Sequence, residues 1–468
     1  QGQIITGLLI DKKLEWDNWE ATVIGDNTIE LRNILEDKRT SLNVNERIIN
    51  VSFQSGYLIV TTLSKCRVYN IEKPNSFSTV DLKGNVIMIL QNPKCFCLVD
   101  SETGLNIYTY EGKTISKPTI PGLKLDQLNS KKIAISQDVI AVIDSTNPKV
   151  LKFFDVANGK SMSLQIEHNN DIKDFDLNCV EIGANRRIAF LDSNKDLFIS
   201  PVVKKDTKKI ISMCNSFKWH ESADILTAAA DLRIHCWYYP AAIYVDKELM
   251  NLCKLVKDEP DIGRDCQIIS FYGNNITVKK KDGSQKVVAS SPYPQMLLDL
   301  CAGNEWDKAI KLCRYIKEEF LWAILASISL GMRHIETAEI SLANINSIEK
   351  VQFITSLANE SPIVRKAELL LYFKKIDEAE ELYLSKGMNY RAIKLNLKLY
   401  RWDRAVQLVK KLKVHADTVL AYREKYLQQM DMDETDDIYK QLKKKVEKYD
   451  WAEIRAKIEE EKAKEPKE

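Results

Sequence analysis

The sequence predicts an all-β, seven-bladed WD-type β-propeller followed by an all-α, tetratricopeptide-like solenoid. Three observations predict this fold: a change in composition near residue 290, a strand-turn-strand phrase that recurs before it, and a helical phrase that recurs after it. Thirteen of the 16 Gly and ten of the 12 Pro lie before residue 295. Because Gly and Pro favour turns, the first region is expected to contain strands and the second helices.

The phrase of the first region is a short apolar strand, a polar turn and a second strand rich in aromatic and β-branched residues. Three copies have an Asp-Ser turn, at residues 100–101, 144–145 and 192–193. A period of roughly 40–45 residues built from short strands is typical of propeller blades. A β-sandwich with accidental spacing is the alternative, and it does not account for the repetition. The second strands end near seven positions, 37 to 46 residues apart: Asn33, Asn70, Thr109, Asp155, Ser200, Tyr238 and Lys280.

The phrase of the second region is a large apolar residue, an acid, a variable residue and Ala. Its four copies begin at Trp306, Ile335, Ile376 and Trp402, with irregular spacings of 29, 41 and 26 residues. An acid suits the first turn of a helix, and a small Ala lets a neighbouring helix approach closely. We therefore predict stacked helical hairpins, with Trp306 and Trp402 in the hairpin core.

Two short apolar stripes lie on charged helices near the end of the chain. One consists of Ile438, Leu442 and Val446, and the other of Trp451, Ile454 and Ile458. They are expected either to dock on the solenoid as a terminal cap, which we favour, or to bind a partner. We place the propeller at residues 1–290, the solenoid at 295–430, and C-terminal helices with a charged tail at 431–468.

Composition argues against several function classes. The 68 basic and 66 acidic residues leave a formal charge of +2, so nothing global indicates nucleic acid or an anionic membrane as a partner. The longest uncharged apolar stretch, residues 320–332, is shorter than the roughly 20 residues that cross a bilayer. The ten Cys include no Cys-x-x-Cys pair, so they are expected to be reduced, buried thiols.

Motifs that carry chemistry are incomplete. Gly159-Lys160-Ser161 lacks the first Gly of a phosphate-binding loop, and Asp431-Met432-Asp433 lacks the Gly and the final Glu of a calcium loop. The five His form no His-Glu-x-x-His pair. Four Lys clusters, at residues 204–205, 208–209, 279–281 and 443–445, lie close to acids and are expected to be solvated faces. We predict no catalytic, cofactor-binding or metal-binding residues, no cofactor and no small-molecule substrate.

Several local segments between about residue 230 and residue 460 are distinctive. They include Trp237-Tyr238-Tyr239-Pro240, Tyr244-Val245-Asp246, Ile268-Ile269-Ser270-Phe271, Asp282-Gly283-Ser284, Arg314-Tyr315-Ile316-Lys317-Glu318, Thr337-Ala338-Glu339-Ile340, Glu349-Lys350-Val351-Gln352 and Asp417-Thr418-Val419-Leu420-Ala421-Tyr422-Arg423. These segments, in this order, resemble the intraflagellar transport protein eighty family. The resemblance implies a non-enzymatic subunit of intraflagellar transport complex B.

This resemblance also implies partners and a location. The protein would act in trains that build and maintain cilia, at the axoneme and basal body and in the cytoplasm, together with other complex B subunits and neighbouring copies. It would insert into no membrane and bind no nucleic acid. The family has two propellers, so we expect this chain to be its C-terminal portion, without the propeller expected to engage a calponin-homology domain. A vesicle-coat-like subunit is the alternative, and it rests on architecture alone.

Overall fold

The structure is a computed structural model that describes residues 13–445 and 450–465, apart from 124, 126–127 and 181–182. It contains two compact units. The first comprises the chain up to Pro240 together with Lys254–Leu298, and it is built of strands. The second comprises Ala241–Cys253 and the chain from Asp299 onward, and it is helical.

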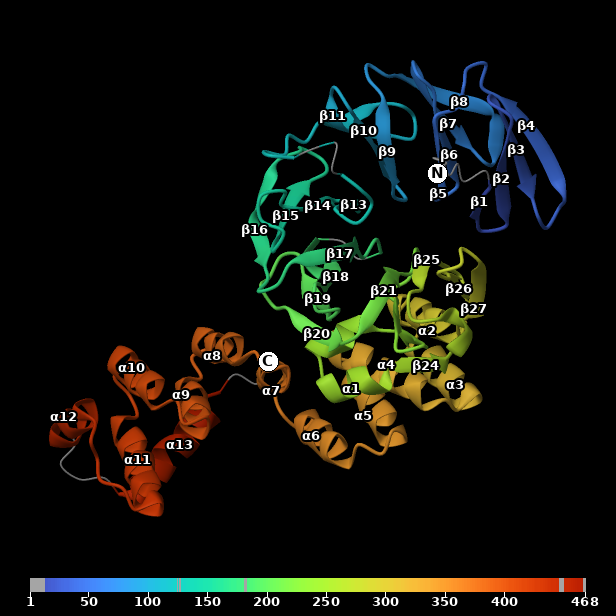
Figure 1. Ribbon diagram of the computed structural model, residues 1–468. Helices are drawn as coiled ribbons and strands as arrows, with labels where there is room; N and C mark the ends of the chain where they lie inside the picture. The colour runs from blue at the N-terminus through green and yellow to red at the C-terminus, as the bar shows by residue number, and fades with distance from the viewer. Residues whose placement is uncertain (1–12, 124, 126–127, 181–182, 446–449, 466–468) are drawn as a thin grey trace. The chain divides into compact units, whose positions relative to one another are not determined.

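Within the described residues, the first unit has seven antiparallel sheets, which follow one another in chain order around a common centre (Figure 1). In each sheet, neighbouring strands are also neighbours in the sequence. Six sheets have four strands and the seventh has three, with these bounds: β1 Lys13–Trp16, β2 Trp19–Ile24, β3 Thr28–Asn33, β4 Lys38–Asn43; β5 Asn50–Gln54, β6 Tyr57–Thr61, β7 Lys65–Asn70, β8 Lys73–Asp81; β9 Val86–Gln91, β10 Cys95–Asp100, β11 Gly104–Thr109, β12 Thr114–Ser116; β13 Ile133–Ile135, β14 Val139–Ile143, β15 Val150–Asp155, β16 Ser161–Glu167; β17 Ile172–Leu177, β18 Arg187–Asp192, β19 Leu197–Pro201, β20 Lys208–Ile211; β21 Cys214–Trp219, β22 Leu226–Ala230, β23 Arg233–Trp237, β24 Lys254–Asp258; β25 Gln267–Tyr272, β26 Asn275–Lys279, β27 Gln285–Ala289.

The repeated phrase of the sequence corresponds to the second and third strands of a sheet. Six of the seven predicted strand ends lie at, or one residue from, the end of a third strand, and the seventh, Lys280, follows the second strand of the three-stranded sheet. The seven sheets confirm the seven-bladed propeller. The Asp-Ser turns connect these two strands. Asp100 Oδ1 accepts a hydrogen bond from the amide of Glu102 (2.8 Å), and Asp192 Oδ1 accepts those of Asn194 and Asp196 (both 2.9 Å). Asp therefore recurs there because its side chain closes the turn.

Polar side chains that follow the first strand of a sheet join neighbouring sheets. Asn92 accepts two amide hydrogen bonds within its own turn, and its Nδ2 donates to the carbonyl of Ser136 in the next sheet (2.8 Å). His220 does the same in the sixth sheet: Nδ1 accepts two turn amides, and Nε2 donates to the carbonyl of Gly273 (3.0 Å). These bonds stabilise the stacking of sheets that lack the usual Trp-Asp signature.

The geometry of His220 predicts an acid-sensitive propeller. Burial lowers the pKa of His220, although the bond to Gly273 opposes the shift, so the unfolded state takes up a proton first as the pH falls below 6.5. Stability should then fall by up to about 1.4 kcal/mol per pH unit. Asn at this place can repeat the bonds of Asn92. In urea unfolding near pH 7.5 and near pH 5.5, about one unit either side of the ordinary value, His220→Asn should therefore lose less stability than the unchanged chain. Equal losses would contradict this role.

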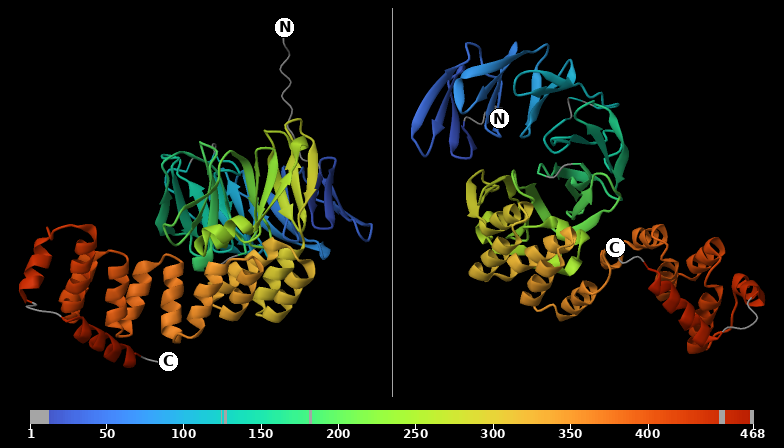
Figure 2. Two further views of the ribbon diagram at one scale, coloured as in Figure 1. Left: turned by 90° about the horizontal axis from the view of Figure 1, so that it is seen from below. Right: turned by 180° about the vertical axis from the view of Figure 1, so that it is seen from behind.

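The second unit consists of helices, and those from α3 to α11 stand side by side in chain order (Figure 2). The helical unit also contains α1, which comes from the segment between β23 and β24 and packs on α4. Helix α2 crosses the boundary between the units. The helices of the described residues have these bounds: α1 Lys247–Leu252, α2 Tyr293–Ala302, α3 Trp306–Ile316, α4 Glu319–Met332, α5 Ile335–Asn344, α6 Ile348–Ala358, α7 Pro362–Tyr372, α8 Ile376–Ser385, α9 Asn389–Lys398, α10 Trp402–Leu412, α11 Ala416–Met430, α12 Asp437–Lys445 and α13 Trp451–Ala463.

The helical phrase of the sequence marks the first turn of four helices. Its large apolar residue is the first residue of α3, α5, α8 and α10, and each of its four Ala residues is 0% exposed. The long spacing of 41 residues arises because the chain makes three helices between the start of α5 and the start of α8, whereas the other two spacings span two helices. The phrase therefore marks helices whose buried Ala allows close packing, but it does not recur after a constant number of helices.

The uncharged stretch at residues 320–332 forms most of α4, whose residues from Leu321 to Leu330 are all buried. In the part of the chain that the structure describes, no helix is long and apolar enough to cross a membrane. The stretch is therefore core material of the helical unit.

The turns between helices share one backbone conformation. Seven residues that stand two positions before a helix have φ between 55° and 73°, in the left-handed region: Asn304, Lys317, Arg333, Asn346, Lys374, Gly387 and Tyr400. At Lys374, for example, its amide donates to the carbonyl of Leu371 and the next amide donates to that of Leu370, both at 2.9 Å. These are the two bonds of a Schellman motif, which ends one helix and lets the next begin after one residue.

Lys374→Gly is expected to stabilise the helical unit by about 0.5–1 kcal/mol. A left-handed conformation strains any residue with a Cβ, and the relief exceeds the entropy that Gly adds to the unfolded chain. Lys366→Gly, at an exposed interior position of α7, should instead destabilise by about 1 kcal/mol. Urea unfolding compares the two; destabilisation by both would show that the side chain of Lys374 contributes more than its backbone costs.

Candidate interaction groove on the C-terminal helices

The last helix of the described chain, α13, packs on the helical unit. Its Ile454 and Ile458 are buried in one cluster with Tyr390 of α9 and Ala421 of α11. Of the other predicted stripe, Leu442 is buried and Ile438 is exposed, whereas Val446 lies outside the described residues. Both stripes therefore place apolar residues against the helical unit, as docking requires.

Charged groups hold α13 in place beside this cluster. Arg391 Nε lies 2.7 Å from the carboxylate of Glu465, and Glu461 pairs with His415 and accepts the amide of Tyr390 (3.2 Å). Lys457 pairs with Asp417 at the start of α11. Glu461 and Glu465 of the tail thus each have a partner on α9 or at the start of α11.

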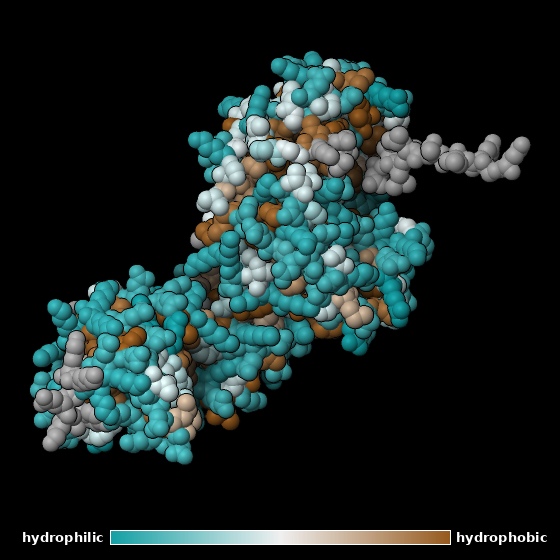
Figure 3. All heavy atoms as spheres, turned by 60° about the vertical axis from the view of Figure 1, so that its left-hand side comes forward, coloured by the Kyte–Doolittle hydropathy of each residue, from teal (hydrophilic) through white to brown (hydrophobic). Residues whose placement is uncertain are grey.

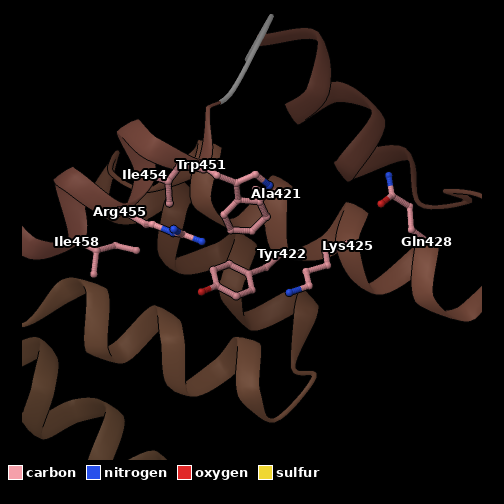
Figure 4. Close-up of a pocket in the computed structure, with 8 residues that line it drawn as sticks. All are labelled: Ala421, Tyr422, Lys425, Gln428, Trp451, Ile454, Arg455 and Ile458. Atoms are coloured by element: carbon pink, nitrogen blue, oxygen red, sulfur yellow. The ribbon is translucent and has the colours of Figure 1, made fainter.

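An open groove of about 470 Å³ lies between α11 and α13 (Figure 4). The rings of Tyr422 and Trp451 face each other edge to face, with centroids 5.5 Å apart, and Trp451 is 36% exposed. Arg455 and Lys425 lie on either side of the Tyr422 ring in this view. Both are exposed, and they are the charged members of this lining: Ala421, Tyr422, Lys425, Gln428, Trp451, Ile454, Arg455 and Ile458.

On a neighbouring face of α11, Arg423 holds the segment that connects α11 to α12. Its guanidinium donates to both carboxylate oxygens of Glu434 (2.9 and 3.2 Å) and lies over the rings of Trp402 and Tyr439, 5.1 and 5.0 Å from their centroids. Tyr439 of α12 in turn donates to the carbonyl of Trp402 (3.1 Å). This arrangement, which we call the Arg423 clamp, attaches α12 to α10 and α11.

The structure corrects the prediction that Trp306 and Trp402 lie in the hairpin core. Both are only partly buried. Trp306 stacks on His334 with ring centroids 4.8 Å apart, and Trp402 packs against Tyr426 at 5.3 Å. In these two helices the small Ala of the phrase is buried, while the large ring at the helix start stays partly exposed at the edge of the core.

Other predicted features have ordinary structural surroundings. Cations of three Lys clusters pair with nearby acids: Lys209 with Asp196 (2.6 Å), Lys281 with Asp265 (3.1 Å) and Lys443 with Glu424 (2.7 Å). All ten Cys are unpaired thiols, and burial raises the pKa of most of them to about 11 or 12. Among described residues, no group of three or more His, Cys, Asp or Glu side chains is placed to hold a metal ion.

The groove and the Arg423 clamp were not predicted from the sequence. A signal exists for the groove, because Tyr422 and Lys425, and Trp451 and Arg455, stand three or four residues apart and therefore share helix faces. Nothing in the sequence shows that these two faces meet. On the visible face of the molecule, most of the surface is hydrophilic and apolar residues form small patches (Figure 3). A local groove is therefore the feature best suited to binding.

Comparison with known proteins gives two domain matches. The family model described as the IFT80 second beta-propeller matches residues 11–293, and the one described as the IFT80/172/WDR35/WDR19 TPR domain matches residues 321–467. Intraflagellar transport protein 80 homologs of Rattus norvegicus and Mus musculus are 35% and 34% identical over 98% of this chain.

The chain spans 60% of the length of each of these two relatives. WD repeat-containing protein 35 of Rattus norvegicus is 34% identical over 19% of this chain and 8% of its own length. The two domain matches follow the two kinds of structure described above, strands first and helices second. The chain belongs to the IFT80 family, of which it carries the second propeller and the TPR-type helices.

Proposed function

We propose that this chain is part of a non-enzymatic scaffold subunit of intraflagellar transport complex B. The observation that carries the proposal is the succession of the IFT80 second propeller and the TPR-type helices along one chain. The homologs are named as intraflagellar transport proteins, and their domains belong to structural families. In this proposal the protein supports train assembly and the ciliary transport that cilium assembly and maintenance require.

The architecture suits a scaffold for physical reasons. A propeller is a stack of sheets whose turns present side chains at fixed positions, and bonds such as those of Asn92 and His220 keep these sheets together. Stacked helices present an extended surface with grooves between them. Function then resides in contact sites on these surfaces. We expect the partners to be other complex B subunits and neighbouring copies in the train, with no nucleic acid or small-molecule substrate.

Localisation and depletion of the full protein in a ciliated cell test this proposal. The tagged protein should be found at the basal body, along the axoneme and in the cytoplasm, and its depletion should stop cilium assembly. Reintroducing the protein should restore cilia. Golgi or endosomal localisation with normal cilia after depletion would favour a vesicle-coat-like subunit instead and would contradict the proposal.

A further inference from the structure

We propose that the groove between α11 and α13 binds an acidic amphipathic helix of another subunit. The inference rests on the proposed scaffold function and adds to it the chemistry of one contact. Three features of the groove support it: its apolar lining, its position between two helices, and the sign of the charges beside it.

The lining of the groove can hold a large apolar side chain. Its floor is made by the buried side chains of Ala421, Ile454 and Ile458, and its walls by the rings of Tyr422 and Trp451. A space of about 470 Å³ is within the range of roughly 300–1,000 Å³ that is usual for binding sites. Aromatic residues at such places contribute strongly to binding energy because they bury large areas with few rotatable bonds.

The position of the groove favours a helix as the occupant. In this unit, the surfaces of helices are covered by further helices: α11 packs on both α9 and α10, and α13 packs on α11. The groove between α11 and α13 is open, and its two walls are helix faces. An amphipathic helix lays apolar residues at positions i, i+3 and i+4 into a groove of this kind.

The charges beside the groove require an acidic partner. Three other cations on α11, α12 and α13 are neutralised: Arg423 by Glu434, Lys443 by Glu424 and Lys457 by Asp417. In contrast, neither Lys425 nor Arg455 has an acid within ion-pair distance among the residues that the structure describes. Both border the apolar lining, so a docked helix would partly desolvate them.

Carboxylates on that helix would gain charge-assisted hydrogen bonds from the two cations, whereas Lys or Arg would be repelled. The fitting partner therefore has a Leu or aromatic anchor that packs against the rings of Tyr422 and Trp451. It also carries Glu or Asp within one turn on each side of that anchor.

Photo-crosslinking in the assembled complex tests the inference. Benzoylphenylalanine replaces Gln428, an exposed residue of the lining, in the full protein, and crosslinked peptides are identified by mass spectrometry. We expect crosslinks to an acidic helical segment of another subunit. The double variant Lys425→Glu with Arg455→Glu should weaken this crosslink more than about ten-fold. A control with the same change of charge elsewhere on the unit, Lys366→Glu with Lys410→Glu, should leave it unchanged.

The outcomes separate this inference from the function on which it rests. If the unchanged protein fails to assemble with complex B subunits, the proposed function is wrong. If the complex assembles but the crosslink joins Gln428 to a basic or neutral segment, or to a second copy of this chain, the acidic-helix inference is wrong. An undiminished crosslink in the charge-reversed variant, with the fold confirmed by circular dichroism, would also overturn it.

Discussion

Replacing Asp246 by Ala is expected to lower the free energy of unfolding of the helical unit by about 2–4 kcal/mol. Asp246 caps α1 by accepting the amide of Glu248 (2.8 Å), and it also accepts the hydroxyl of Tyr372 (2.5 Å) and pairs with Lys350 (2.7 Å). The side chains of Asp246 and Lys350 are only 13% and 17% exposed. Removal of the carboxylate therefore leaves a largely buried ammonium group and a hydroxyl with poorer partners.

The neighbouring Glu248 provides the matched control. It pairs with the same Lys350 at 2.8 Å, but its side chain is 81% exposed, so Glu248→Ala should cost less than about 1 kcal/mol. Urea unfolding of both variants, and of Asp246→Ala combined with Lys350→Met, measures the coupling between the pair. Equal effects of Asp246→Ala and Glu248→Ala would contradict the central place of Asp246 in this network.

The same network should weaken in acid. Burial by itself raises the pKa of Asp246, but the bonds from Lys350, Tyr372 and the Glu248 amide outweigh it and bring the pKa below the ordinary 3.8. A carboxyl whose pKa is lowered by folding stabilises the protein above that ordinary value and loses this contribution as the pH falls through its folded pKa. The free-energy difference between the unchanged chain and Asp246→Ala should therefore shrink below about pH 4.

Arg423→Ala should detach α12 and cost about 2–4 kcal/mol in the stability of the C-terminal helices. The Arg423 clamp combines a two-bond contact to Glu434 with contacts of the guanidinium to the rings of Trp402 and Tyr439. Arg423→Lys should lose most of the same energy, because an ammonium group cannot form the planar two-bond contact or stack in the same way.

Hydrogen exchange of the α12 amides measures this detachment directly. Lys443→Ala is the control, because Lys443 reaches α11 through an ion pair with Glu424 and its side chain is 69% exposed. Its loss should cost no more than about 0.5 kcal/mol. Protection of α12 that is unchanged in Arg423→Ala would show that buried Tyr439 and Leu442 hold the helix without the clamp.

Local repeats were the part of the fold that the sequence could predict. Third strands were placed in six sheets, and the second strand in the seventh, because each strand end carries the same short-range pattern, and Asp100 and Asp192 close their turns through neighbouring amides. Helix starts at Trp306 and Trp402 were correct for the same reason. The predicted burial of the two Trp rings was wrong, because the exposure of a ring in the first turn depends on which helices pack beside it.

Contacts between distant segments were beyond the sequence. Asp246 and Lys350 belong to two segments that resemble the family, yet neither segment shows that the other is its partner. The groove raises the same difficulty, since Tyr422 and Trp451 meet only because α13 turns back onto α11. Pairing of this kind is set by packing in three dimensions, and single-sequence periodicity describes one helix face at a time.

The most direct test of the account is the set of proteins recovered with the full protein from ciliated cells. Affinity purification followed by quantitative mass spectrometry should recover the other subunits of intraflagellar transport complex B in near-constant ratio to it. Recovery of the protein only with coatomer or nuclear pore components would contradict its assignment as a scaffold subunit of that complex.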